Sequence, residues 1–440
     1  MLFCASRKDL HMKKYYLSIV GILAASFAFG QTAATTNQNL AFPAQKKMTT
    51  SVYEKISEST AVVKAKDDVV RQNIRRSNAA VVVGESQYDL QTNASVARRV
   101  ILHPDGTVSM VWTQAPDDQF AERGAGYKYI STAGGWFNAN PLVTERIESV
   151  RTGWPQIGVL NNGNEFTLGH IAADGGWART ENTGKGTSFT QTDASVNDDV
   201  DWKPIWGRIA TTGDTVHLIS SYTDSSQAGD LRSKTINGVF AAMTYSRSTD
   251  GGRTWDIQHQ TLPEYDSTRY TTGGGDQYSI DANGDVVAIT TTDLTEDLAY
   301  WKSTDRGTTF TKVIVDSFPY APYAENKLML DTPLTQDGTT SILVDDNGNV
   351  HLTWALSRIL ETDTTEPGFR FFPGTQALAY WNEVTQNAEI IAEGADLDLN
   401  GDGVLTFSGG NIQNLSGGNL PDGANHVART GNTSLLTMPS

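Results

Sequence analysis

From about residue 81 onward, short runs in which apolar and polar residues alternate are broken by Gly, Asn and Asp. Alternation with a period of two predicts half-buried β-strands, because successive side chains of a strand point to opposite faces. Five segments join two such runs across a tight turn, at residues 101–112, 157–168, 209–219, 280–289 and 342–354. Their Asn-Gly, Asp-Gly and Gly-Asp turns tolerate the positive φ of short hairpin loops, so each segment is predicted to be a β-hairpin.

The hairpins recur at a spacing of ~50–70 residues, which leaves space in each unit for two more strands. Repeated four-stranded units are typical of propeller blades, which pack face to face and leave few exposed edges. The sequence therefore predicts an all-β fold, a β-propeller with four-stranded blades, in which six blades are favoured and seven are the alternative. A pair of β-sandwiches would not explain the long period. Residues 433–440 resemble the approach to a further inner strand, so we expect the chain to be truncated in its last blade.

One octapeptide occurs in two of the units, as STDGGRTW at residues 248–255 and as STDRGTTF at residues 303–310. It resembles the Asp-box (BNR repeat) of sialidase-like β-propellers of the exported Bacteroidetes type, and the likeness extends over about residues 81–393. In such a turn a carboxylate accepts free backbone N–H groups, glycine takes an unusual φ, and an aromatic side chain packs between blades. The resemblance implies structural roles, away from the active face, for Ser248, Asp250, Gly252, Trp255, Ser303, Asp305, Gly307 and Phe310.

The N-terminal residues have a different character. Lys13 and Lys14 precede an apolar run over residues 15–29, which small and polar residues follow. This pattern predicts a secretory signal peptide over residues 1–30, with translation starting at Met12. The apolar run is too short to be a membrane span. We therefore expect the protein to be secreted by a Gram-negative bacterium or held at its surface.

The rest of the chain divides into two parts. Residues 31–80 are rich in Thr, Ala, Asn and Gln near their start and are predicted to be a flexible lead-in with a short helix. Residues 81–440 are predicted to be the propeller, incomplete at its C-terminus, with an Asp/Gly-rich insertion near residues 394–425.

Charge and cysteine content exclude some classes of function. The net charge is −16, and the single cysteine, Cys4, lies within the N-terminal segment that export would remove. Thiol catalysis and Cys-ligated metals are thus excluded for the mature protein. An acidic surface repels phosphate backbones, which argues against nucleic acid as a partner. We expect a monomer without a membrane span, whose partner is an extracellular glycan or protein.

The candidate ligand-binding residues come from the predicted loops. In a propeller, the loops that enter the inner strands, and those between the second and third strands, gather around the axis on one face. Aromatic side chains there can stack on a sugar ring, while Asp and Arg bind its polar groups. Packing between blades is the alternative role for these aromatic residues. The candidates are Trp154, Asp201, Trp202, Trp206, Arg208, Asp276 and Tyr278.

Catalytic residues are not identified by the sequence. The resemblance to sialidases implies three arginines that hold a carboxylate, one of them in a Phe/Tyr-Arg-Ile-Pro motif. This motif is absent, and residues 98–101 (RRVI) are the nearest match. Two carboxylates for glycoside hydrolysis cannot be chosen from spacing, because their separation is set in three dimensions. We expect binding of a glycan or surface protein, with catalysis left open; the alternative is a glycoside hydrolase or lyase that uses the same loops.

One segment has the composition of a calcium loop. Asp396, Asp398, Asn400 and Asp402 place oxygen ligands on alternate residues beside glycines, as Ca²⁺ loops do. The position where such a loop ends on a bidentate acid is Gly409. A weak Ca²⁺ site and a plain turn are therefore equally supported, and no other cofactor is predicted.

Overall fold

The computed structural model describes residues 83–393, except for gaps at 89–90, 92–93, 131–135, 138–145, 172–175, 184, 186–188, 194–201, 225–234, 274–276, 323–327, 363–369 and 372–376. The described residues form strands, turns and loops, with no α-helix among them. Five antiparallel units follow one another along the chain, each built on four strands, so the fold is an all-β propeller. We call these units blades 1 to 5.

The predicted signal peptide, the lead-in and the C-terminal segment after residue 393 lie outside the described residues, so the prediction of six blades stays a prediction. Among the residues that the structure does describe, no helix has the length and apolar content needed to cross a bilayer.

Each blade is a meander in which strands pair with their neighbours in sequence order. Blade 1 contains β1 (Val100–Leu102), β2 (Val108–Gln114), β3 (Gly124–Ile130) and β4 (Trp136–Phe137), and blade 2 contains β5 (Thr152–Val159), β6 (Glu165–Ile171), β7 (Trp177–Asn182) and β8 (Phe189–Asp193). Blade 3 contains β9 (Trp202–Thr212), β10 (Thr215–Asp224), β13 (Met243–Ser248) and β14 (Ile257–Gln260), with a separate hairpin of β11 (Thr235–Ile236) and β12 (Val239–Phe240). Blade 4 contains β15 (Tyr278–Asn283), β16 (Val286–Thr291), β17 (Leu298–Ser303) and β18 (Thr311–Asp316). Blade 5 contains β19 (Leu334–Val344), β20 (Val350–Leu360), β22 (Ala377–Asn382) and β23 (Ala388–Glu393), and β21 (Arg370–Phe371) also pairs with β20.

The five predicted hairpins are confirmed, because each is the pair formed by the first two strands of a blade. Their turn residues explain why they form. Gly106 and Gly163 have φ values of +81° and +80°. Side chains with a Cβ rarely adopt such values, and glycine does so without steric cost.

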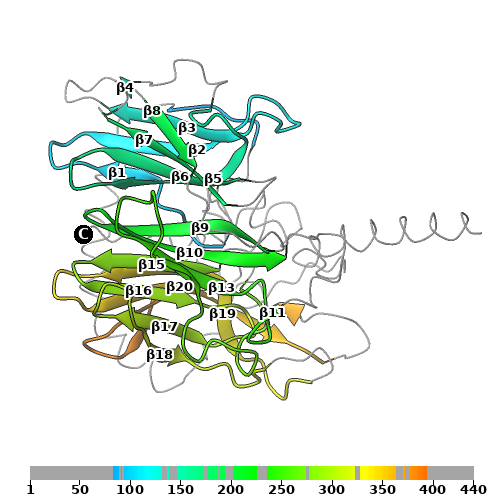
Figure 1. Ribbon diagram of the computed structural model, residues 1–440. Helices are drawn as coiled ribbons and strands as arrows, with labels where there is room; N and C mark the ends of the chain where they lie inside the picture. Colours follow the sequence, from blue (N-terminus) through cyan, green and yellow to red (C-terminus); the bar gives the residue numbers. More distant parts are fainter. Residues whose placement is uncertain are drawn as a thin grey trace, which may run out of the picture.

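The blades pack on one another through their first strands. β5 contacts blade 1, β9 contacts blade 2, β15 contacts blade 3 and β19 contacts blade 4. Figure 1 shows the strands of blades 1 and 2 at one end of the view, β9 and β10 of blade 3 in the middle, and the strands of blades 4 and 5 toward the other end. The buried apolar clusters lie between blades. Tyr245 of blade 3 and Trp301 of blade 4 belong to one cluster, and Tyr300 of blade 4 and Trp354 of blade 5 belong to the next.

The two octapeptides form closely similar turns. In the first, Asp250 Oδ1 accepts the backbone N–H groups of Arg253 (3.0 Å) and Thr254 (2.8 Å), and Ser248 Oγ accepts the N–H of Gly252 (2.8 Å). The second turn repeats these bonds at equivalent positions. Each carboxylate thus stabilises backbone donors that the turn leaves without a strand partner.

The aromatic residue of each octapeptide packs against the preceding blade. Trp255 is 8% exposed and belongs to a cluster with Leu160 and Phe166 of blade 2. Phe310 meets Tyr245 of blade 3 edge-on, with the ring centroids 4.9 Å apart. The octapeptide turns therefore join neighbouring blades as well as closing hairpins.

The residues that lead into β1 contact blades far along the chain. Arg98 pairs with Asp281 of blade 4 (Nη2 to Oδ1, 2.8 Å), and the Ser95 carbonyl accepts a hydrogen bond from Arg208 of blade 3 (2.6 Å). Ser95 is fully buried. This segment, residues 94–99, therefore ties blade 1 to the inner strands of blades 3 and 4.

Candidate functional site

The two ends of the blades differ. One end carries the hairpin turns between first and second strands together with the octapeptide turns, and we call it the turn face. The opposite end carries the loops that enter the first strands and the loops between second and third strands, and we call it the mouth face. Loop residues are the usual carriers of function on a rigid scaffold, and clustered polar groups lie on both faces.

Two half-buried carboxylates lie at the mouth face where blades 4 and 5 meet. Asp293 follows β16 almost directly, and Asp337 lies within β19. Between Gln336 and Thr340, β19 has two more residues than the facing stretch of β20. The strand therefore bulges at Asp337, and a bulge re-aims a side chain out of the regular alternation.

The bulge brings the backbone next to Asp337 against blade 4. Gly338 has a φ of +86°, and a Cβ added there would lie 2.9 Å from Gln277 Nε2 and 3.5 Å from Asp293 Oδ1. A side chain at this position would meet both the strain of the φ and the crowding. The close approach sets Asp293 beside the residue that follows Asp337.

Few donors bind these carboxylates. Asp337 Oδ1 accepts from the backbone N–H (2.9 Å) and the hydroxyl (2.5 Å) of Thr339, and no other described residue donates to Asp337. Asp293 Oδ1 accepts from the backbone N–H of Leu294 (2.7 Å), and the Gln277 amide also bonds to this carboxylate.

The surroundings raise the pKa of both carboxyl groups. Burial, together with the neighbouring charge of Asp293, raises the pKa of Asp337 to about 6. Burial also raises the pKa of Asp293, although its hydrogen bonds oppose the shift. A raised pKa leaves each carboxyl group more protonated at mildly acidic pH than an unperturbed aspartate would be. Such a pair can donate a proton from one member and use the other as a base or nucleophile.

A third carboxylate supports the same loop. Glu296 is 1% exposed, and its Oε1 accepts from the backbone N–H groups of Thr271 (2.6 Å) and Thr272 (3.0 Å). Burial, reinforced by the charge of Asp293, raises the pKa of Glu296. Because its contacts are to backbone ahead of β15, Glu296 joins the β16–β17 loop to the loop that enters β15.

Three arginines lie near a buried histidine at the mouth face of blades 1 to 3. Burial and the positive charges of Arg123, Arg151 and Arg208 lower the pKa of His170 to about 3, so the imidazole is neutral at physiological pH. His170 is 7% exposed, and its Nδ1 has no hydrogen-bond partner among the described residues. Arg123 lies 5.1 Å from the ring centroid of Tyr88, and neither Arg123 nor Arg151 pairs with a described carboxylate. Basic side chains thus lie near His170 at blades 1 to 3, whereas Asp293 and Asp337 lie where blades 4 and 5 meet.

Several residues predicted to bind ligand are buried. Trp154, Arg208 and Tyr278 are 5%, 3% and 0% exposed. The Arg208 Nε donates to Ser95 Oγ (3.0 Å), and the Tyr278 hydroxyl donates to the Trp206 carbonyl (2.7 Å). These contacts join blade 3 to blade 4 and to the segment before β1, which is the packing role given above as the alternative.

Trp154 and Trp206 occupy equivalent positions in blades 2 and 3. Their φ values are +51° and +53°, and each lies where its inner strand shifts register against the second strand. Trp206 is half-buried. Asp201 and Asp276 lie outside the described residues, as does the side chain of Trp202. Ligand binding by this set stays a prediction.

The predicted calcium loop, Asp396 to Asp402, also lies outside the described residues. Within residues 83–393, and with the gaps given above, no cluster of three or more His, Cys, Asp or Glu side chains has the arrangement of a metal site.

Sequence reasoning did not select Asp293, Asp337 or Gln277 as a group. A signal for Asp337 is present, because Asp337-Gly338 interrupts an otherwise alternating strand, and such an interruption is typical of a bulge. The proximity to Asp293 has no local signal, since 43 residues, which include the two outer strands of blade 4, separate the two in the sequence.

No family model and no curated protein matches the chain. Among solved structures, it is similar to a thermostable family-43 glycoside hydrolase at 13% identity, over 70% of this chain and 96% of that chain, with a TM-score of 0.34. It is also similar to an α-L-arabinanase from Penicillium chrysogenum complexed with arabinobiose, at 11% identity over 67% and 83% of the two chains, with a TM-score of 0.37. A variant of NanB sialidase from Streptococcus pneumoniae matches at 11% identity over 70% and 65%, with a TM-score of 0.38. At scores this low the likeness identifies neither a family nor an activity.

Proposed function

We propose that this protein is a glycan-acting propeller that hydrolyses glycosidic bonds with Asp337 and Asp293. One observation supports the proposal above the others: two half-buried carboxylates with raised pKa values lie at the mouth face, where the backbone next to Asp337 approaches Asp293. Perturbed carboxyl groups gather at catalytic sites because acid–base catalysis needs a pKa near the working pH.

The assignment of roles follows from the surroundings of each group. Asp337, with a pKa raised to about 6, is the proton donor to the leaving glycosidic oxygen. Asp293 accepts from the Leu294 N–H and from the Gln277 amide, which stabilise its ionised form, so it is the base or nucleophile. The distance between the two carboxyl groups with substrate bound decides between a direct attack and an attack through water.

A second candidate reaction rests on His170 and Arg123. A neutral imidazole can remove the proton at C5 of a uronate, the C4–O bond breaks, and a C4–C5 double bond forms while the leaving oxygen takes a proton from water; the guanidinium balances the charge of the uronate carboxylate. His170 is only 7% exposed, whereas Asp293 and Asp337 are both half-buried. A substrate can therefore reach the two aspartates more readily than His170, which favours the hydrolytic reaction.

The remaining sequence-based expectations are part of the same proposal. We propose that the protein is exported, acts as a monomer on an extracellular glycan, and binds Ca²⁺ weakly at residues 396–402. Glycan binding without turnover is the alternative for the mouth face.

Incubation of the full-length protein with sialyllactose, arabinan, xylan, mannan and pectate tests the proposal. We expect new reducing ends from at least one of these glycans, without the ultraviolet absorbance of a C4–C5 double bond. The Asp293→Asn and Asp337→Asn variants should release none, and Asp118→Asn, at an exposed carboxylate in the β2–β3 loop, should behave as wild type. Absorbance from pectate would support the lyase reaction, and binding without any product would support the binding protein.

A further inference from the structure

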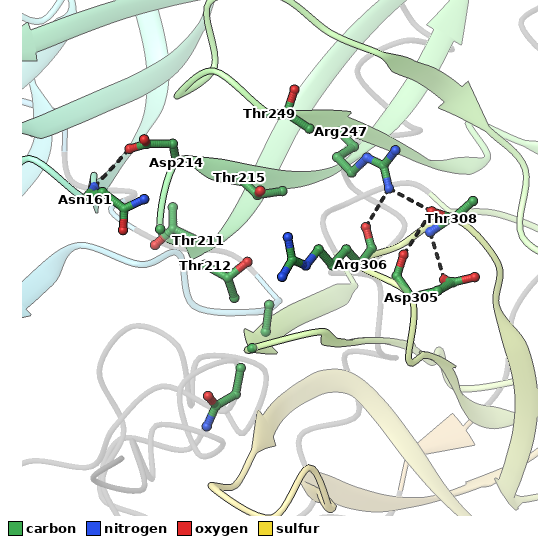
Figure 2. A pocket seen from close by; sticks show the side chains of 14 residues that line it. Asn161, Thr211, Thr212, Asp214, Thr215, Arg247, Thr249, Asp305, Arg306 and Thr308 are labelled. Carbon is green, nitrogen blue, oxygen red and sulfur yellow. Dashed lines mark hydrogen bonds between the residues drawn. The ribbon is translucent and has the colours of Figure 1, made fainter.

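A polar pocket lies on the turn face between blades 3 and 4, at the opposite ends of the strands from Asp337 (Figure 2). It has a volume of about 900 Å³. Small-molecule sites usually measure ~300–1,000 Å³. Residues 211–215 of the β9–β10 hairpin, residues 282–284 of blade 4 and parts of both octapeptide turns line it, with Asn161 of blade 2.

The pocket is lined by two cations and two anions, and each already has a partner. Its two cations, Arg247 and Arg306, bind Asp256 and Asp285, each at 2.5 Å. Of its two anions, Asp214 accepts from the backbone N–H of Asn161 (2.9 Å), and Asp305 accepts from N–H groups within its own octapeptide turn. An anionic ligand would therefore have to displace Asp256 or Asp285, and a cationic ligand would have to compete with backbone N–H groups for a carboxylate, so the pocket favours a neutral ligand.

Hydroxyl and amide groups remain to bind such a ligand. The side chains of Thr211, Thr215, Thr249 and Asn161 make no hydrogen bond to any described residue. Figure 2 shows Thr211 and Thr215 in the part of the pocket that Arg306 also faces. Hydroxyls both donate and accept, and amides offer both functions side by side, which matches the paired donors and acceptors of neighbouring sugar hydroxyls.

From this charge balance and lining, we propose that the turn-face pocket is a second saccharide site, which binds a segment of a neutral glycan. The ligand gains hydrogen bonds to the threonine hydroxyls and to the Asn161 amide, while the pairs of Arg247 and Arg306 stay in place as further donors and acceptors at the rim. Binding here does not require chemistry at Asp293 and Asp337, which lie at the other face.

The test measures binding of neutral hexasaccharides derived from arabinan, xylan, mannan and cellulose, by isothermal titration calorimetry on the full-length protein. The double variant Thr211→Val and Thr215→Val removes two hydroxyls with little change in shape, and Thr249→Arg fills the pocket from an exposed turn position. Thr311→Val, at an exposed position of β18, is the matched control. Melting curves establish that each variant is folded.

We expect one hexasaccharide to bind wild type and Thr311→Val equally, and to bind about tenfold more weakly, or with one site fewer, in the double variant and in Thr249→Arg. Asp337→Asn should keep this binding, so the loss of turnover and the loss of the pocket are distinguishable. Equal affinity in all the variants, or no binding to wild type at millimolar concentrations, would overturn the proposal.

Discussion

Asp337→Asn is expected to lower kcat on a cleaved glycan by about 10²–10⁴-fold, which is the usual contribution of one general acid–base group. The amide has nearly the same shape as the carboxyl group and can still accept from Thr339, so the bulge in β19 is retained. The amide cannot donate a proton to a leaving oxygen as the acid does. KM should change little, because binding of the ground state does not depend on this proton.

Two control experiments test whether the loss of kcat in Asp337→Asn is due to the missing proton donor. Asp118→Asn removes a carboxylate from the same face but far from blades 4 and 5, and its kcat should equal that of wild type. A leaving group of low pKa needs little protonation, so an activated aryl glycoside should restore much of the rate of Asp337→Asn. An equal loss on activated and natural substrates would assign Asp337 a structural role.

Trp301→Ala should destabilise the fold by about 3–5 kcal/mol, the range found when a large buried aromatic side chain is truncated. Trp301 is 0% exposed and belongs to the cluster between blades 3 and 4. Its indole N–H donates to the Pro263 carbonyl (2.7 Å), and its ring meets that of Tyr265 edge-on at 5.7 Å. Truncation therefore leaves both a cavity and an unpaired buried carbonyl.

Urea denaturation followed by circular dichroism and by Trp fluorescence gives the change in the midpoint. Ile314→Ala, on the outer strand β18 with Ile314 49% exposed, is the control and should cost less than about 0.5 kcal/mol. If both variants unfolded at the same urea concentration, the cluster between blades 3 and 4 would not be the packed core that the fold requires.

The hairpins were predictable because their determinants are local. An Asn-Gly or Asp-Gly turn between two alternating runs specifies a hairpin within about a dozen residues, as at Gly106 and Gly163. The octapeptides were visible for the same reason, since every donor that Asp250 binds lies within four residues of it.

The candidate site was less predictable because its determinants are not local. Arg208 looks available in the sequence, but its guanidinium is bound by Ser95, which precedes it by 113 residues. Asp293 and Asp337 come close only because blades 4 and 5 pack together and β19 has a bulge of two residues. The alternation of apolar and polar residues predicts neither feature. Burial, which raises both pKa values, is likewise a property of the assembled blades.

The most direct test is a ¹³C NMR titration of the aspartate carboxyl groups in wild type and in Asp337→Asn. The surroundings described here predict one carboxyl resonance that titrates near pH 6, well above the ~3.9 of an unperturbed aspartate, and that is missing from the variant. The folded state then binds this proton more tightly than the unfolded chain does. The contribution of this group to the free energy of unfolding therefore increases as the pH falls from about 6 to about 4. A spectrum in which Asp337 titrates with an ordinary aspartate pKa would contradict its role as the proton donor.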